Sequence, residues 1–185
     1  WYIIGAISVA CLPLSLWAAA RLSVPAQRNT AVGGIKLRLI WKELAGYIGF
    51  AMGYIVYLTF LSAWMTDQQA PALLISAVWI IMGVALIASP FVWRGVLARH
   101  ASGKPLAMIL TGIAVGSALP LVLPAGGAVV ISAIVFGLCV FMAPSAITSF
   151  IRQNLPAESW AAAMSLFTVV FAVAQTAGPF AAGAL

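Results

Sequence analysis

The chain has 185 residues, of which 64% are hydrophobic and 6% charged, and nine Lys and Arg against three Asp and Glu give a net charge of +6. No single water-soluble core can enclose that share of apolar residues, so the composition excludes a soluble globular domain. The positive charge indicates membrane topology rather than a nucleic-acid-binding surface, because long apolar stretches separate the groups of basic residues. We expect an all-α polytopic membrane protein in contact with the lipid bilayer, with no nucleic-acid partner.

Six apolar segments divide the chain, and each is long enough for a helix that crosses a hydrocarbon core about 30 Å thick. Their approximate ranges are 1–20, 41–65, 70–92, 105–123, 126–151 and 157–185. None of them shows the strict alternation of a barrel strand. The sequence therefore predicts six transmembrane helices.

The basic residues fall at alternate connections between these segments. The first, third and fifth connections and their edges hold all nine: Arg21, Arg28, Lys36, Arg38, Lys42, Arg94, Arg99, Lys104 and Arg152. The second connection has only Asp67 as a charged residue, and the fourth has none. With six crossings the odd connections share one side, which the positive-inside rule places in the cytoplasm. Near this edge, Glu43 is expected to form an interfacial ion pair with Lys42.

The second segment carries an aromatic face and a glycine stripe. At about 100° per residue, four aromatic residues share one sector: Tyr47, Phe50, Tyr54 and Tyr57. The stripe beside them consists of Gly46, Gly49 and Gly53, which indicates a helix-packing seam. Tyrosine hydroxyls in hydrocarbon need partners, so this face either bonds to another helix or lines a substrate cavity. The sequence leaves both alternatives open.

Polar residues and helix breakers mark the last two segments. Near Pro144, a polar stripe runs along one face at helical spacing: Ser145, Thr148, Ser149 and Arg152. In the last segment another face holds Thr168, Phe171, Gln175 and Pro179. Small residues such as Gly178 permit close helix approach, and Pro179 loosens the preceding turn, which is typical of a moving part. Gln175 is a candidate for either substrate contact or a structural hydrogen bond to a neighbouring helix.

Two motifs resemble those of the major facilitator superfamily. The run Ala174-x-x-x-Gly178-Pro179-x-x-Ala182-Gly183 resembles the glycine-rich motif of its fifth and eleventh helices. The basic connection with Gly95, Arg99, Gly103 and Lys104 resembles its cytoplasmic loop between helices eight and nine, without the acidic residue of that loop. The run 137–183, with Thr148, Arg152 and Gln175-x-x-Gly-Pro, resembles the YbfB/YjiJ-like branch.

The resemblance implies a partial major facilitator fold. Residues 1–20 would be the last helix of the N-terminal half, 21–40 the cytoplasmic linker, and 41–185 the C-terminal half truncated before its twelfth helix. We therefore expect a fragment of a bacterial inner-membrane permease that moves a small organic solute by alternating access. Its expected partners are that solute and the missing N-terminal half, with a coupling proton as a further candidate.

Site residues are expected from the face patterns and the resemblance together. The expected cavity residues are Tyr47, Phe50, Tyr54, Tyr57, Thr148, Thr168, Phe171 and Gln175. The expected gating or helix-packing residues are Gly49, Gly53, Pro144, Gly178 and Pro179.

The sequence does not indicate an enzyme. His100 is the only histidine, and no Asp or Glu lies between Asp67 and Glu158. A nucleophile with its base, a set of metal ligands or a phosphate-binding loop is therefore not expected at membrane depth. We expect no catalytic residue, metal or cofactor. A non-transporting membrane scaffold or receptor is the alternative to a transporter.

Overall fold

The computed structural model describes residues 9, 10, 13, 16, 17, 37–123 and 126–183. The chain divides into two compact units, Trp1–Thr30 and Ala31–Leu185. In the first unit the few described residues are all helical and exposed. The expected transmembrane helix at 1–20 and most of the expected linker at 21–40 lie outside the described residues.

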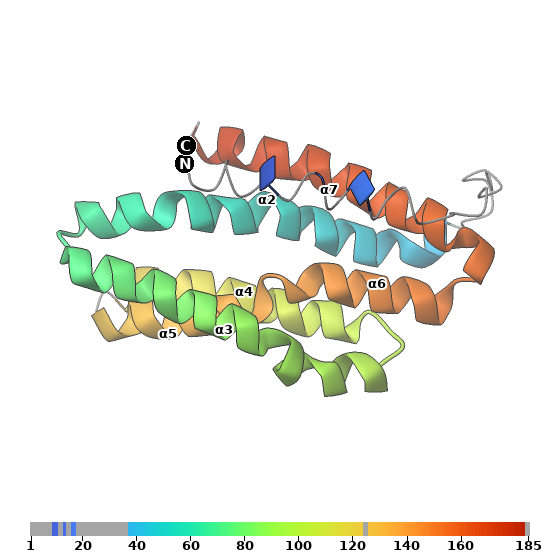
Figure 1. The fold of residues 1–185 in the computed structure, drawn as a ribbon, viewed down its shortest axis with the longest axis horizontal. Coiled ribbons are helices and arrows are strands. Elements are labelled where there is room, and N and C mark those ends of the chain that lie inside the picture. The colour runs from blue at the N-terminus through green and yellow to red at the C-terminus, as the bar shows by residue number, and fades with distance from the viewer. Residues whose placement is uncertain (1–8, 11–12, 14–15, 18–36, 124–125, 184–185) are drawn as a thin grey trace. The chain divides into compact units, whose positions relative to one another are not determined.

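Helices make up the described part of the second unit (Figure 1). They are α2 (Leu37–Asp67), α3 (Ala72–Arg99), α4 (Lys104–Val122), α5 (Gly126–Cys139), α6 (Met142–Asn154) and α7 (Trp160–Gly183), with a 3₁₀ turn, η2 (Ala157–Ser159), before α7. When α5 and α6 are counted as one crossing and η2 is joined to α7, five spans among these residues are long and apolar enough to cross a membrane. The all-α, multi-pass class is confirmed for the described residues, whereas the sixth crossing is not tested.

Two helices extend beyond the apolar segments that predicted them. α2 begins at Leu37, inside the range expected for the linker, and α3 continues to Arg99, past the expected end at 92. A helix pairs its backbone groups internally while basic side chains reach the headgroup layer, so it can continue out of the hydrocarbon. Gly95 and Arg99 of the basic motif are consequently helical, and only residues 100–103 form the turn.

The fifth predicted segment is broken into two helices. α5 ends at Cys139 and α6 begins at Met142, two residues before Pro144. Pro144 has no N–H to donate to the carbonyl of Val140, and its ring displaces that carbonyl. The Val140 N–H still donates to the Phe136 carbonyl at 2.8 Å, which confines the break to residues 140 and 141.

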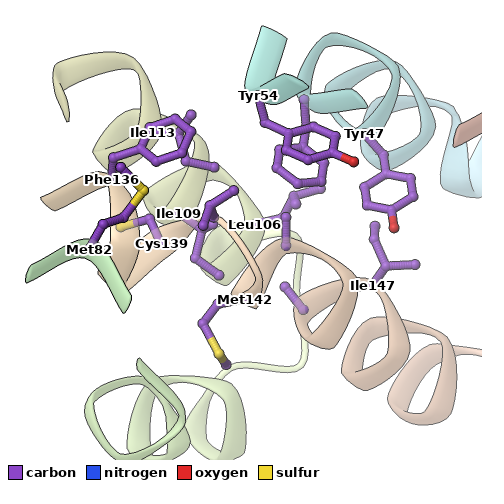
Figure 2. Packing of buried hydrophobic residues seen from close by; sticks show 14 of the residues in the cluster. Tyr47, Tyr54, Met82, Leu106, Ile109, Ile113, Phe136, Cys139, Met142 and Ile147 are labelled. Atoms are coloured by element: carbon purple, nitrogen blue, oxygen red, sulfur yellow. The ribbon is translucent and has the colours of Figure 1, made fainter. Parts of the chain in front are cut away.

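The core of the bundle centres on α5, which packs against both α3 and α4, while α2 packs along α7. Phe136 of α5 is fully buried, and Figure 2 shows it beside Met82 and Ile113. Two glycines allow these close contacts. A Cβ on Gly137 would lie 2.8 Å from the Met82 carbonyl oxygen, and one on Gly116 would lie 2.9 Å from the Phe136 nitrogen. Any larger residue there would push α5 away from α3 or α4.

One end of the bundle brings three parts of the chain together. Gln153 of α6 donates through Nε2 to the Leu97 carbonyl at 3.3 Å, and Asn154 donates to the Ala101 carbonyl. The Glu43 carboxylate of α2 lies against Gly103. This end therefore gathers the basic residues of the described helix ends, which are Arg38, Lys42, Arg94, Arg99, Lys104 and Arg152, whereas Asp67 closes α2 at the other end.

Candidate functional site

Aromatic rings of α2 and α7 form one cluster inside the bundle. The Tyr47 ring centroid lies 5.3 Å from that of Phe171, and the rings of Phe50 and Tyr54 stack at 4.8 Å. Tyr54 also stacks on Phe171 at 5.8 Å. The three α2 residues are 6%, 4% and 8% exposed in chain order. Much of this face is therefore a contact between two helices.

The hydroxyl groups of Tyr47 and Tyr54 have a different environment from their buried rings. Neither hydroxyl has a hydrogen-bond partner among the described residues, and no described buried side-chain oxygen is left without one. Both oxygens must therefore keep some accessible surface. Figure 2 shows the Tyr47 hydroxyl directed toward the part of α6 that carries Ile147. The rings fasten α2 to α7, and the hydroxyls are available to water or to a ligand.

Tyr57, the fourth member of the predicted face, contacts different helices. Its ring stacks on Phe136 at 4.0 Å, and its hydroxyl lies 2.6 Å from Ser132 Oγ. Ser132 in turn donates to the Gly116 carbonyl of α4 at 2.5 Å. Because the single hydroxyl proton of Ser132 is used there, Tyr57 is the donor to Ser132. Tyr57 thus joins α2 to α5 and α4 inside the apolar layer.

Ser132 satisfies a carbonyl that a proline has left free. Pro120 of α4 cannot donate a backbone N–H to the carbonyl of Gly116, four residues earlier. The same relation recurs in α3, where Pro90 leaves the Leu86 carbonyl free and Ser89 Oγ donates to it at 2.8 Å. Ser89 and Ser132 are the buried polar residues of the described core. Neither serine was among the residues predicted from the sequence, although an internal proline identifies the carbonyl that needs a donor.

The glycines of the predicted packing seam differ in what they contact. Gly46 faces a Leu110 methyl, from which a Cβ would lie 3.2 Å away, but Gly49 and Gly53 have open space beside them. All three border a hollow of about 440 Å³ between α2, α4 and α5, which Phe50 and Tyr54 also line. Among the described residues, a helix contact through this seam is present only at Gly46.

Gly178 marks the closest approach of α7 to α2. It is buried, and a Cβ there would overlap the backbone carbonyl of Met52. Because backbone cannot move aside as a flexible side chain can, only glycine fits at this position. Gly178 therefore sets the register of the two helices, one residue before Pro179.

Gln175 is half-buried and has no hydrogen-bond partner within the described ranges. Pro179 lies four residues later and supplies no N–H to the Gln175 carbonyl, and no described side-chain donor takes its place, in contrast to the carbonyls of Leu86 and Gly116. Gln175 consequently offers two amide donors, an amide acceptor and a backbone acceptor within a spanning helix.

The two threonines of the predicted cavity are bonded within their own helices. Thr148 donates to the Pro144 carbonyl at 3.0 Å and lies 4.0 Å from the Met164 sulfur of α7. Thr168 is exposed and donates to the Met164 carbonyl at 2.8 Å. The single hydroxyl proton of each threonine is therefore used inside the protein.

The predicted basic motif lies at the end of the bundle where α3 turns into α4. Arg99 and Lys104 are exposed, Gly95 has open space beside it, and Gly103 precedes the first turn of α4. The ion pair expected between Glu43 and Lys42 is absent from the described part, and the Lys42 ammonium instead lies 5.9 Å from the Trp41 ring centroid.

The Glu43 carboxylate approaches Gly103 from α2, at the start of α4, where the positive end of the helix dipole favours a negative charge. The acidic group beside this turn therefore comes from a neighbouring helix. The sequence could not indicate this contact, because the two residues are far apart along the chain.

The fold and these groups together define a multi-pass membrane protein with polar groups and internal prolines in helices long and apolar enough to cross a membrane. Within the described ranges, no three His, Cys, Asp or Glu side chains gather in a way that could hold a metal ion. A family model described as "Uncharacterised MFS-type transporter YbfB" matches residues 1–185, and the chain belongs to this family of major facilitator transporters. No curated protein and no solved structure matches the chain.

Proposed function

We propose that the protein is a secondary transporter that moves a small organic solute by alternating access, with part of its cavity along α2, α6 and α7. Transporters of this kind bind their substrate near the middle of the membrane, where helices are interrupted and leave backbone groups free. Membership of a transporter family supports the class. The break between α5 and α6 beside Pro144, the Gln175 carbonyl that Pro179 leaves free inside α7, and the accessible hydroxyls of Tyr47 and Tyr54 support the position of the cavity.

The observation that carries this proposal is that the Gln175 side chain has no hydrogen-bond partner among the residues that the structure describes. A polar side chain inside a spanning helix is costly unless it has a partner or a function. Four residues further along α7, Pro179 leaves the Gln175 carbonyl free as well, and Gly178 keeps the helix against α2. Gln175 is therefore our candidate for substrate contact.

The proposal extends to orientation and architecture. Residues 41–185 would form the C-terminal bundle, residues 21–40 the cytoplasmic linker and residues 1–20 the last helix of the preceding bundle. The basic end of the described bundle would face the cytoplasm of a bacterial cell. Proton coupling would require Glu43 or a carboxylate elsewhere, because Asp67 and Glu158, the other described acids, lie at helix ends.

The experiment compares Gln175→Leu with Thr176→Val in the intact protein reconstituted into proteoliposomes. Labelled neutral, zwitterionic and carboxylate solutes are first screened to find one that is taken up. Gln175→Leu should raise the apparent KM at least about ten-fold while leaving the melting temperature unchanged, since one or more substrate hydrogen bonds are lost. Thr176 is the matched control, because it is exposed and bonds only to the Ala172 carbonyl of its own helix.

The opposite pattern would reject the assignment of Gln175. If Gln175 is structural, Gln175→Leu should lower the melting temperature and leave KM unchanged. Absence of uptake for every solute, in proteoliposomes that hold folded protein, would reject the transporter itself.

A further inference from the structure

The polar stripe of α6 separates into two sets of side chains in the folded protein. Ser149 and Gln153 are engaged with α3, because Ser149 Oγ lies 3.4 Å and Gln153 Nε2 3.3 Å from the Leu97 carbonyl oxygen. Gln153 also donates to Ser149 Oγ at 2.7 Å. Ser145, Thr148 and Arg152 remain on the other side of the stripe, and they have no bond to α3 among the described residues.

These side chains border a hollow of about 440 Å³ on the surface of α6, whose lining also includes Pro144. Its available donors are the Ser145 hydroxyl and the Arg152 guanidinium. Ser145 has no hydrogen-bond partner in the described part of the chain, and Thr148 donates only within its own helix. The guanidinium of Arg152 adds several N–H groups and a permanent positive charge.

Arg152 is held beside this hollow by an aromatic ring rather than by an acid. Its guanidinium carbon lies 5.2 Å from the Trp160 ring centroid. The Trp160 indole is itself fixed, because its Nε1 donates to the Leu155 carbonyl at 2.9 Å. No carboxylate among the described residues forms an ion pair with Arg152. A stacked arginine keeps its N–H edges free for a ligand, so its charge is oriented but not neutralised.

From this arrangement we propose an oxyanion-binding site on α6, in which Arg152 binds a carboxylate or phosphate group and the Ser145 hydroxyl donates to it, while Thr148, whose proton is used on the Pro144 carbonyl, borders the group. Arginine pairs with such groups through two parallel hydrogen bonds, and hydroxyl donors add directed contacts. The group can belong to a soluble organic anion or to an anionic lipid headgroup. A soluble anion would give the substrate class of the transporter, because Thr148 belongs to the proposed cavity, and that identification rests on the proposed function.

Melting of the intact protein in nanodiscs tests the site apart from transport. In phosphatidylcholine nanodiscs, the probes are succinate, benzoate and inorganic phosphate, against choline chloride at the same ionic strength. A second set of nanodiscs contains phosphatidylglycerol. Wild type should melt at a higher temperature with one of the soluble anions or with phosphatidylglycerol. Arg152→Gln should need about ten-fold more ligand to reach the same rise in melting temperature, and Ser145→Ala should need a smaller increase.

Arg94→Gln is the matched control, because Arg94 is an exposed arginine at the same end of the bundle. A response to soluble anions that needs Arg152 and not Arg94 supports the site with a solute as its ligand. A response to phosphatidylglycerol alone, with the same dependence, supports the site with a headgroup as its ligand. Equal responses of Arg152→Gln and wild type, equal losses in both arginine variants, or no response to any probe would overturn the site.

Arg152→Lys and Ser145→Ala provide the comparison where Arg152→Gln does not fold. The lysine variant keeps the charge and loses the paired geometry, so it should bind more weakly than wild type. Failure of anion binding while transport persists would reject this site and leave the proposed function intact.

Discussion

The hydroxyl oxygens of Tyr57 and Ser132 lie 2.6 Å apart although 75 positions separate these residues along the chain. This bond connects α2 to α5, and Ser132 also donates to the Gly116 carbonyl, which connects α5 to α4. The three helices are thus joined by a chain of hydrogen bonds that begins at the Gly116 carbonyl, which Pro120 leaves without a backbone donor. Inside an apolar layer such a chain resists separation of the helices, because each group would lose its partner without gaining water.

Removal of Ser132 should therefore cost more than removal of the Tyr57 hydroxyl. Ser132→Ala leaves both the Tyr57 hydroxyl and the Gly116 carbonyl unpaired, whereas Tyr57→Phe leaves Ser132 bonded to Gly116. We expect losses of about 1–3 kcal/mol and about 1 kcal/mol respectively in unfolding free energy. Equilibrium unfolding in mixed micelles measures both. The double variant should be little worse than Ser132→Ala alone, and simple additivity would contradict the connected chain.

Gly178→Ala should destabilise the contact between α2 and α7. The added methyl group meets the Met52 backbone, which has no rotamer with which to move away. Overpacking of this kind costs about 1–3 kcal/mol. Gly83→Ala is the matched control, since a Cβ on Gly83 of α3 meets nothing within 4 Å. Thermal melting should show a drop for Gly178→Ala and no drop for Gly83→Ala; equal melting temperatures would show that α7 does not approach α2 closely.

Gly103→Ala should act through Glu43. The new methyl group would occupy the place of the Glu43 carboxylate, which can swing away because it ends a flexible side chain. We expect the loss of a carboxylate at the α4 start, about 0.3–1 kcal/mol, equal to that of Glu43→Ala. Thermal melting of both variants measures this loss, and the double variant should lose no more than either single variant. Gly95→Ala on the same motif should lose nothing, because Gly95 has open space beside it.

Cysteine labelling should place the two ends of the bundle on opposite sides of the membrane. In a background with Cys11→Ala and Cys139→Ala, Asp67→Cys should react with an impermeant thiol reagent added outside intact cells. Ser102→Cys, in the turn between α3 and α4, should react only after the cytoplasmic side is opened. Both side chains are exposed at helix ends. Labelling of position 67 from the cytoplasm alone would reverse the proposed orientation.

The apolar segments and the polar connections between them are local properties, so the sequence was sufficient to predict these segments. Spans of continuous hydrophobicity marked α2, α3, α4, α7 and the combined span of α5 and α6, but the division of that span into two helices was not predicted. The clustering of basic residues at one end results directly from the order of connections. Backbone hydrogen bonding in an apolar medium must be satisfied within each segment, which is why these elements depend so little on their neighbours.

The contacts of each helical face were decided only by the tertiary structure. Tyr47 and Tyr57 share one sector of α2, yet Tyr47 packs on α7 and Tyr57 bonds to α5, because the long helix passes different neighbours along its length. The glycines likewise look equivalent in sequence, but Gly178 meets backbone while Gly53 meets open space. Helical periodicity fixes which residues share a face. The order of helices in space, set by close packing of complementary surfaces, determines what that face contacts.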